Sequence, residues 1–421
     1  MDFYLYNRTS EILKDFEYIN EGVDFKKMIT FDLAYYLLNN KNIISKIKYI
    51  IKLFFSFKCI GFWDGFVNNK IVFSLSQSNR KDYIEMINFI RIDIERSKLV
   101  FVDKCFKRCF SFLNLFLLSY VVKAVWKCNC DISTKIFIAF QIFDYQNSLK
   151  SFIASKPALM ELDNKYSYIP FNSSRGFENM ITQYLNGKNV KTFHLCHGLH
   201  FSPNYKRFTI DAFNKELISA NTVLSWGKAF VDNDKKYYKH NYIHEIVGNP
   251  KYSYHKINIS FSTDSCVVFL ARKQYQNNNM YLLEELFYVS KRIGTKFIIK
   301  PHPSLDMALM RKVCKEYGFK LYEKSTTIRD LLLSEKFGFS ISYESTAYFE
   351  AMFYDLICFR YSKDENEAYG DLDNRFCNGE ELMLQIKKYE RMNMKEISLL
   401  IEDTLVYELG IGVNRYKEVI G

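Results

Sequence analysis

The chain has 421 residues, and 48% of them are hydrophobic, which is enough for two domains that each bury a core. This composition excludes an intrinsically disordered protein. The formal net charge of +11 favours an anionic partner, which charge alone leaves open between a nucleotide, an acidic glycan and the anionic face of a membrane.

Ten cysteines are spread along the chain without a repeated spacing, and the sequence opens without a secretory leader. We therefore expect a reducing, cytoplasmic location. The pairs Cys105/Cys109 and Cys128/Cys130 lack the spacing of a zinc ribbon, and no histidine follows them at finger distance. We expect these four side chains to be small buried groups and not metal ligands.

Two segments of the first half bear on membrane contact. Residues 46–58 mix lysines with aromatic and aliphatic residues at partly helical spacing, which fits a helix on an anionic bilayer or a helix that packs one face inward. The apolar run 110–126 is shorter than the roughly 20 residues of a membrane span and contains Asn114 and Lys123. A buried core helix is the better interpretation of this run.

Strand and helix patterns alternate along the chain, which predicts an α/β fold of two doubly wound domains with parallel sheets. In the first domain we expect strands at 70–75, 99–103, 157–162, 191–196, 222–226 and 245–250, a helix at 176–186 and another from Lys228. In the second we expect strands at 266–271, 296–300, 319–322, 337–342 and 356–360, with helices at 280–293, 307–317, 328–333 and 346–353. The polar, Ser-rich stretch 251–264 predicts a boundary that divides the chain into 1–255 and 256–421.

Polar residues follow the strand predicted at 296–300. Lys300 and His302 supply hydrogen-bond donors, and two flanking prolines, one of them Pro303, hold the histidine at the strand mouth. Ligands bind at the carboxyl ends of strands in open α/β sheets, which favours a ligand contact over the alternative that His302 caps the next helix. Arg272, at the end of another predicted strand, is placed to meet an anionic ligand.

Ser345 and Thr346 lie where the strand at 337–342 passes into a helix. Their hydroxyl and backbone N–H groups lie at the positive end of the helix dipole, and two adjacent hydroxyls are more than an N-cap needs. We expect them to bind a phosphate together with Lys300 and His302, and Glu344 to accept a hydrogen bond from a ribose. A nucleotide diphosphate and a sugar-linked monophosphate both fit this chemistry.

Three histidines, His194, His197 and His200, run from a predicted strand into a loop. This spacing suits a metal site when the residues lie on a helix, so we expect no metal here. A histidine near neutrality is better suited to act as a general base on an acceptor hydroxyl, and His197 is the candidate. Glu161 and Asp163 follow another predicted strand end and are alternative substrate contacts.

The strand that runs into His197-Gly198, the turn Lys300-Pro-His-Pro303 and the helix that opens at Ser345-Thr346 together resemble bacterial surface-polysaccharide transferases of the GT-B type that use cytidine-activated donors. That group includes capsule Kdo transferases, bacterial sialyltransferases and polysialyltransferases, and the CDP-glycerol glycerophosphotransferases. The resemblance spans about residues 150–360. It implies two Rossmann-like domains that face a central cleft, with an acceptor-binding domain at 1–255 and a nucleotide-donor-binding domain at 256–421.

The resemblance implies a metal-independent inverting glycosyltransferase that moves an acid sugar, of the sialic acid or Kdo type, from a CMP-sugar to a glycan or glycolipid in capsule or lipopolysaccharide synthesis. His302, Ser345 and Thr346 would hold the nucleotide phosphate. The base would be His197, as in the glycerophosphotransferase branch, or an acidic residue such as Glu161 or Asp163, although the Asp/Glu-Asp-Gly pattern of the sialyltransferase branch is absent.

A CDP-polyol phosphotransferase of surface-polymer synthesis is the alternative function that the resemblance implies. In either case the expected partners are the nucleotide-linked donor and the acceptor. No nucleic acid is expected among the partners, and contact with the anionic inner membrane is expected to be peripheral, on its cytoplasmic face.

Overall fold

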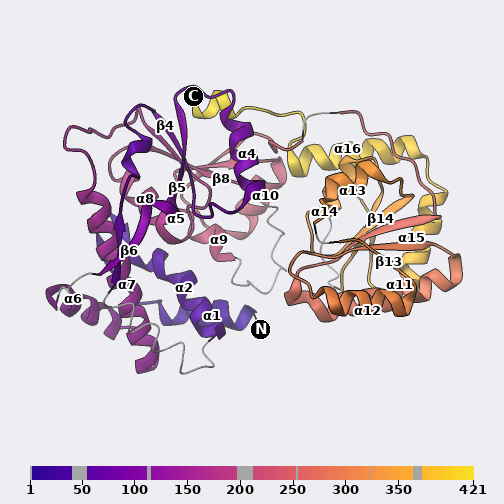
Figure 1. Ribbon diagram of the computed structural model, residues 1–421, viewed down its shortest axis with the longest axis horizontal. Coiled ribbons are helices and arrows are strands. Elements are labelled where there is room, and N and C mark those ends of the chain that lie inside the picture. The colour runs from indigo at the N-terminus through magenta and orange to yellow at the C-terminus, as the bar shows by residue number, and fades with distance from the viewer. Residues whose placement is uncertain are drawn as a thin grey trace. The chain divides into compact units, whose positions relative to one another are not determined.

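The computed structural model describes residues 2–39, 55–110, 115–196, 212–252, 255–323, 325–363 and 372–421 (Figure 1). The chain divides into two compact units, Met1–Lys251 together with Asn414–Gly421, and Tyr252–Val413. Each unit holds a six-stranded sheet whose neighbouring strands are parallel. The predicted fold class, two α/β domains of the Rossmann-like type, is therefore confirmed.

The observed division differs from the expected one in the assignment of the C-terminal residues. The segment Asn414–Gly421 returns to the first unit, where it forms the short helix α17 (Tyr416–Ile420). The Tyr416 hydroxyl donates to the carbonyl oxygen of Gly248 at 2.9 Å, and the backbone N–H of Arg415 donates to that of Val247 at 3.3 Å. The buried Tyr416 ring fixes this return, which a boundary drawn from composition does not foresee.

The first sheet is doubly wound around a reversal in strand order. Its strands are, in sheet order, β10 (Ile243–Ile246), β9 (Thr222–Ser225), β8 (Lys191–Leu195), β7 (Ser167–Pro170), β4 (Ile71–Leu75) and β5 (Ser97–Phe101). Helices α4 (Lys81–Arg91), α8 (Gly176–Asn186) and α10 (Lys228–Tyr237) connect them. Successive strands build outward in both directions from the β4–β7 pair, which is the topological switch point.

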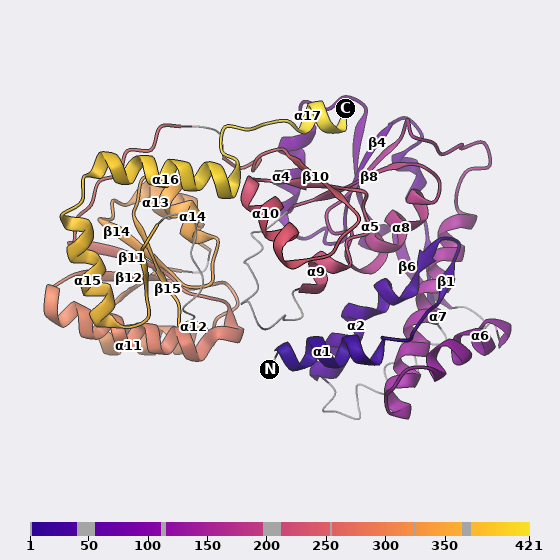
Figure 2. The same cartoon turned by 180° about the vertical axis from the view of Figure 1, so that it is seen from behind.

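The second sheet has the strand order of dinucleotide-binding folds. Its strands are β13 (Lys320–Leu321), β12 (Lys296–Lys300), β11 (Ser265–Phe269), β14 (Phe339–Ser342), β15 (Cys358–Tyr361) and β16 (Arg375–Phe376), which read 3-2-1-4-5-6 along the chain. The helices are α11 (Gln276–Ile293), α12 (Met307–Tyr317), α13 (Ile328–Ser334), α14 (Ala347–Phe353), α15 (Gly379–Glu390) and α16 (Met394–Leu409). In both views α11 and α12 lie on one face of the sheet and α13, α14 and α16 on the other (Figures 1 and 2).

The N-terminal part adds a layer of helices and two antiparallel strand pairs to the first domain. Its elements are α1 (Asp2–Ile12), β1 (Ile19–Asn20), β2 (Val23–Asp24), α2 (Phe25–Asn39), β3 (Phe55–Cys59), β6 (Phe106–Phe110), α6 (Leu115–Trp126) and α7 (Ile132–Ala154). Shorter turns of helix are η1 (Trp63–Gly65), α5 (Val102–Cys105), α9 (Phe213–Glu216) and, in the second domain, η3 (Lys273–Tyr275). A stacked pair at its centre, Trp63 and Phe152, is joined by a hydrogen bond from the indole N–H of Trp63 to the Phe152 carbonyl at 2.9 Å.

Three sequence predictions in the first domain need correction. The strand expected at 157–162 is a turn, closed by a hydrogen bond from Met160 N–H to the Pro157 carbonyl, and its Leu159 side chain is exposed. Part of 46–58 lies outside the described residues, and Phe55–Cys59 is a β-strand and not a helix, because it pairs with β6. The helix within 110–126 buries one face and exposes Trp126 on the other, so it is not a fully buried core helix.

No helix among the described residues is long and apolar enough to span a membrane.

Candidate functional site

The second sheet has its switch point between its two central strands, β11 and β14, which is where open α/β sheets bind ligands. Phe269, the last residue of β11, pairs with Lys300 of β12 on one side and with Ser342 of β14 on the other. The loops that follow these three strands therefore leave the same edge of the sheet next to one another. Both predicted phosphate motifs begin in these loops.

His302 lies in a turn that is tied to the loop after β11. Its Nδ1 accepts a hydrogen bond from the backbone N–H of Ser304 at 3.1 Å and lies 2.9 Å from the Ser304 hydroxyl. That hydroxyl also accepts from the backbone N–H of Lys273 at 2.9 Å. Because Nδ1 is the acceptor, a neutral imidazole carries its proton on Nε2, which makes Nε2 a donor for a ligand. The alternative role, in which His302 caps the next helix, is excluded because Asp306 is the cap of that helix, α12.

Lys300 does not point to the switch point. Its side chain is buried, and Nζ donates to the carbonyl oxygen of Glu323 at 3.3 Å. Glu323 follows β13, which lies on the side of β12 away from β11. Burial also lowers the pKa of the Lys300 ammonium group. The predicted convergence of Lys300 with Ser345 and Thr346 is therefore not found. The Lys300 side chain points instead towards the loop after β13, the neighbour of β12 on the other side.

The turn between β14 and α14 presents hydrogen-bond donors. Glu344 has a left-handed backbone with φ of 43°, which is unusual for a residue with a side chain and is found at functional turns. The Ser345 hydroxyl accepts from the backbone N–H of Ala347, the first residue of α14, at 3.2 Å, while the side chain of Thr346, the N-cap residue, makes no capping hydrogen bond. The Thr346 hydroxyl and the backbone N–H groups of Ser345 and Thr346 have no partner in the described part of the chain. This turn fits an anion.

Aromatic side chains border the switch point. The rings of Tyr275, after β11, and Tyr343, after β14, meet edge to face with centroids 5.7 Å apart. The Tyr343 hydroxyl accepts from the amide of Asn278 at 2.6 Å, and the guanidinium carbon of Arg272 lies 5.9 Å from the centre of the Tyr275 ring. Arg272 thus lies where it was predicted, on the loop after β11. A planar base can stack on such rings.

A buried hydroxyl without a partner lies next to these rings. Tyr361, the last residue of β15, packs edge to face on Tyr343 with centroids 5.2 Å apart. Its hydroxyl is one of the buried side-chain atoms of the described chain that lack a hydrogen bond. Burial raises the pKa of Tyr361 to about 12, so this group stays protonated and can donate to a ligand.

The residues predicted in the first domain fall into different places. His194 is buried, and its Nδ1 accepts from the backbone N–H of Ser173 at 3.2 Å, which gives it a structural role. His197 lies outside the described residues and stays a prediction. Glu161 and Asp163 precede β7 instead of following a strand, so they lie at the amino edge of the sheet, opposite the carboxyl ends. Glu161 and Asp163 were expected to take part in catalysis because they would follow a strand end, and they do not follow one.

Sequence reasoning missed Glu178, a buried carboxyl at the switch point of the first sheet. One of its oxygens accepts from the Ser74 hydroxyl at 2.7 Å and from the Phe171 backbone N–H at 3.0 Å, and the other accepts from the Ser76 hydroxyl at 2.7 Å. The residue thus joins the end of β4 to the end of β7. Burial raises the pKa of Glu178 to about 7.

The raised pKa of Glu178 makes the stability of the first domain depend on pH. The folded state binds the proton more tightly than the unfolded chain, so the free energy of unfolding should fall as pH rises from about 4.5 to about 7. Glu178→Gln should remove this slope and raise stability at pH 8 by on the order of 3 kcal/mol. Urea unfolding followed by tryptophan fluorescence measures it, since all three tryptophans belong to the first unit.

Glu161→Gln is the matched control for this prediction, because Glu161 is exposed and should leave the slope unchanged. An unfolding free energy whose pH dependence is the same in Glu178→Gln and in the native chain would contradict the assignment.

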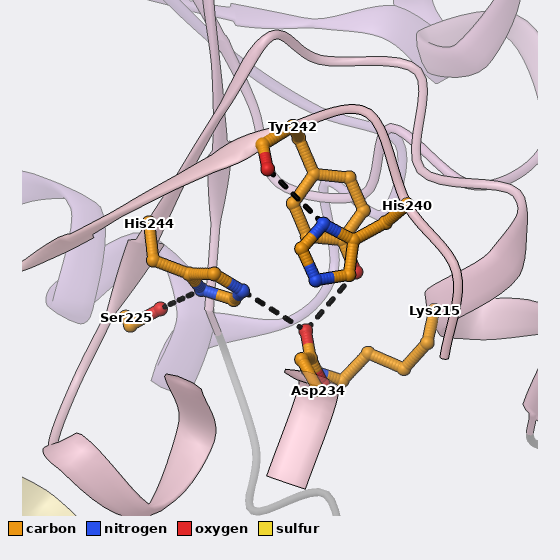
Figure 3. A network of polar contacts seen from close by, with 6 residues as sticks. All are labelled: Lys215, Ser225, Asp234, His240, Tyr242 and His244. Atoms are coloured by element: carbon orange, nitrogen blue, oxygen red, sulfur yellow. Dashed lines mark hydrogen bonds and ion pairs between the residues drawn. The ribbon is translucent and has the colours of Figure 1, made fainter. Parts of the chain in front are cut away.

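A second buried network lies at the ends of β9 and β10 (Figure 3). Lys215 Nζ lies 2.9 Å from one oxygen of Asp234, and the other oxygen accepts from the Tyr242 hydroxyl at 3.0 Å. That second oxygen also lies 3.5 Å from Nε2 of His244, whose Nδ1 is 2.8 Å from the Ser225 hydroxyl. The network joins α9, α10, β9 and β10.

Ser225, His244 and Asp234 have the three residue types of a hydrolytic triad, but the likeness goes no further. Ser225 is fully buried, so its hydroxyl cannot reach a substrate. Burial is the main cause that lowers the pKa of His244 to about 4, so the imidazole is neutral at physiological pH. We interpret this network as a structural one that holds the edge of the first sheet together.

A cavity of about 730 Å³ opens at the amino edge of the first sheet. Its lining includes two carboxylates, Asp93 and Glu95, and a larger number of cationic side chains, those of Lys70, Arg96, Lys165, Lys191 and Lys417. Helices that enter the strands of a parallel sheet end at this edge, and cations favour the negative ends of helices. This explains the charge without a ligand. Among the described residues, no group of histidine, cysteine and acidic side chains is arranged to hold a metal ion.

No protein-family model matches the sequence, and no curated protein matches it. Solved structures similar to the chain include a TarM variant from S. aureus in complex with fondaparinux, alpha-GlcNAc-glycerol and UDP, which is 16% identical with a TM-score of 0.43 over 62% of this chain and 56% of that chain. The chain thus spans little more than half the length of TarM.

Two further structures are similar over most of both chains. The lipopolysaccharide outer core galactosyltransferase WaaB is 12% identical with a TM-score of 0.43 over 83% of this chain and 96% of that chain. A structure from E. coli described as trehalose-6-phosphate bound with UDP-2-fluoro glucose is 8% identical with a TM-score of 0.48 over 83% and 97%. At these identities the likeness concerns the fold and assigns no activity to this chain.

Proposed function

We propose that the chain is a glycosyltransferase of the GT-B type, which binds a nucleotide-sugar at the switch point of its second sheet and transfers the sugar to a glycan acceptor. One observation carries the proposal. The loop after β11 contacts both neighbouring loops, through Lys273 with Ser304 and through Tyr275 with Tyr343. It therefore links the turn that holds His302 to the turn that holds Thr346 along the carboxyl edge of the sheet.

The phosphate and the base of a nucleotide each have a fitting group at this edge of the sheet. The phosphate accepts from Nε2 of His302 and from the Thr346 turn, Arg272 adds a positive charge, and the base stacks on Tyr275. In the transfer, the acceptor oxygen forms a bond to the anomeric carbon while the bond from that carbon to the phosphate oxygen breaks. The nucleotide leaves with the electron pair, stabilised by these donors, and the acceptor proton passes to a base, for which His197 stays our proposal.

The donor that we propose is a CMP-linked acid sugar, on the resemblance of the motifs at 300–303 and 345–346. TarM and the E. coli structure were solved with UDP and UDP-2-fluoro glucose, so a uridine nucleotide is the first competitor to test. Since protein groups supply the donors to the phosphate, we also propose that binding needs no metal ion.

Thermal unfolding with CMP, CDP, UDP, GDP and dTDP, each with and without EDTA, tests the donor, because a ligand of the native state raises its melting temperature. We expect CMP to stabilise the protein most. A preference for CDP would indicate the alternative, a polyol phosphotransferase, and a preference for UDP would contradict the cytidine donor. Stabilisation lost in EDTA would contradict metal independence.

The place of binding is tested with Thr346→Val, which removes one hydroxyl from an exposed residue and should weaken CMP binding about threefold to tenfold. Thr263→Val is the matched control, since Thr263 precedes β11 at the amino edge of the same sheet. Equal CMP affinity in both variants would show that the nucleotide does not bind at the β14–α14 turn.

A further inference from the structure

An exposed apolar face covers the pair of helices α6 and α7, which lie side by side in both views of the first domain (Figures 1 and 2). Trp126 of α6 is 72% exposed and Ile132 of α7 is 74% exposed, and Tyr120 and Ile136 are exposed as well. On the opposite side of α6, Val121 and Val125 pack into the core of the domain. The helix pair thus carries apolar side chains on its exposed face as well as on the face that packs into the domain.

One lysine makes this face continuous between the two helices. Lys135 Nζ donates to the carbonyl oxygen of Trp126 at 3.0 Å and lies 4.9 Å from the centre of the indole ring. Lys135 belongs to the same turns of α7 as Ile132 and Ile136. Single exposed apolar residues are ordinary on a protein surface, but a joined group of large ones marks an interaction site.

The charge around this face is positive. Lys123 and Lys127 are exposed beside Trp126, and Lys135 lies within the face. The nearby carboxylate of Asp131 is engaged as the cap of α7, where it accepts from the backbone N–H of Thr134 at 3.0 Å and from its hydroxyl at 2.7 Å. Lysines that surround Trp, Tyr and Ile are the composition of surfaces that lie in the headgroup region of anionic bilayers.

We propose that the α6–α7 face, formed by Tyr120, Trp126, Ile132 and Ile136 with Lys123, Lys127 and Lys135, binds the surface of an anionic bilayer. The aromatic and aliphatic side chains insert at the level of the headgroups, and the lysines pair with lipid phosphates. This binding is peripheral, and it does not depend on the proposed glycosyl transfer, because it requires no nucleotide.

Tryptophan fluorescence of the full chain tests the proposal directly. Trp63 and Trp226 are buried, so Trp126 is the exposed member of the three tryptophans. With vesicles of phosphatidylcholine and phosphatidylglycerol, we expect a blue shift of the emission and quenching by brominated acyl chains, both absent in Trp126→Phe. Raising the salt concentration should weaken binding, since the lysine–lipid attraction is screened.

Vesicle sedimentation of two matched variants locates the face. Ile132→Glu should lower vesicle affinity about tenfold or more, since it replaces an inserting side chain by an anion. Ile92→Glu changes an equally exposed isoleucine at the end of α4 and should leave the affinity unchanged. Both substitutions are at the surface, and an unchanged unfolding curve confirms that each variant is folded.

The proposal is overturned if the native chain does not sediment with anionic vesicles, if it binds pure phosphatidylcholine equally well, or if Ile132→Glu and Ile92→Glu bind alike. Self-association that Ile132→Glu abolishes, without vesicle binding, would assign the face to a second copy of the chain and would equally overturn it. If the chain binds anionic vesicles but binds no nucleotide, the inference of bilayer binding stands and the proposed function fails.

Discussion

Replacing Lys215 by methionine is expected to destabilise the first domain by about 3–5 kcal/mol, the cost of leaving one member of a buried ion pair alone. Lys215 and Asp234 are both almost inaccessible to solvent, and their closest atoms are 2.9 Å apart. Without the ammonium group, the Asp234 carboxylate keeps the hydrogen bond of Tyr242 but loses its counter-charge. Urea unfolding followed by tryptophan fluorescence measures the change.

The same substitution at a surface pair is the control for this prediction. Lys165 lies 3.5 Å from Asp163, and both side chains are largely exposed, so Lys165→Met should cost less than about 1 kcal/mol. The double variant Lys215→Met with Asp234→Asn should lose less stability than the single one, because the amide is uncharged and its oxygen still accepts from Tyr242. A single variant as stable as the double one would show that the charge of Asp234 is not the source of the loss.

The elements of the second domain follow from its sequence because each one is short, periodic and clearly ended. The structure has β12 at Lys296–Lys300 and α12 at Met307–Tyr317, with the bounds predicted. Asp306 caps that helix, and Gly318 ends it with a left-handed φ of 73°, so both of its ends are local signals.

The first domain was less predictable because tertiary contacts decide its polar positions. Helix α8 buries Glu178 and Gln183, which a surface helix would expose, since the N-terminal layer covers it. The Gln183 side chain accepts from the backbone N–H of Asp24 at 2.8 Å, a partner far away in the sequence. In the same way, the apolar turn at Leu159 has the composition of a strand but no neighbouring strand to pair with among the described residues.

The candidate site could be predicted by its motifs but not by its geometry. The sequence indicates that Arg272, His302 and Thr346 follow strand ends, yet the order of strands in the sheet decides which ends are neighbours. The contact between Tyr275 and Tyr343 depends on the pairing of β11 with β14, and the direction of Lys300 depends on β13. Neither the pairing of β11 with β14 nor the position of β13 beside β12 can be predicted from the local sequence.

Replacing His302 by asparagine is expected to weaken CMP binding about 10- to 100-fold while leaving the fold intact, if the nucleotide binds as proposed. The Oδ1 of asparagine takes the place of Nδ1 and continues to accept from the backbone N–H of Ser304. The donor at the position of Nε2 is lost, and with it a hydrogen bond to a charged phosphate. Isothermal titration with CMP measures the effect, and thermal unfolding without ligand verifies the fold.

His302→Gln separates this role from a purely structural one, because its side-chain amide reaches the position of Nε2 and restores a donor there. We expect it to recover most of the CMP affinity that His302→Asn loses, although it no longer holds the turn at Ser304. A structural role predicts the reverse order, with asparagine tolerated and glutamine not. Equal affinity in the native chain and in both variants would place the phosphate away from His302.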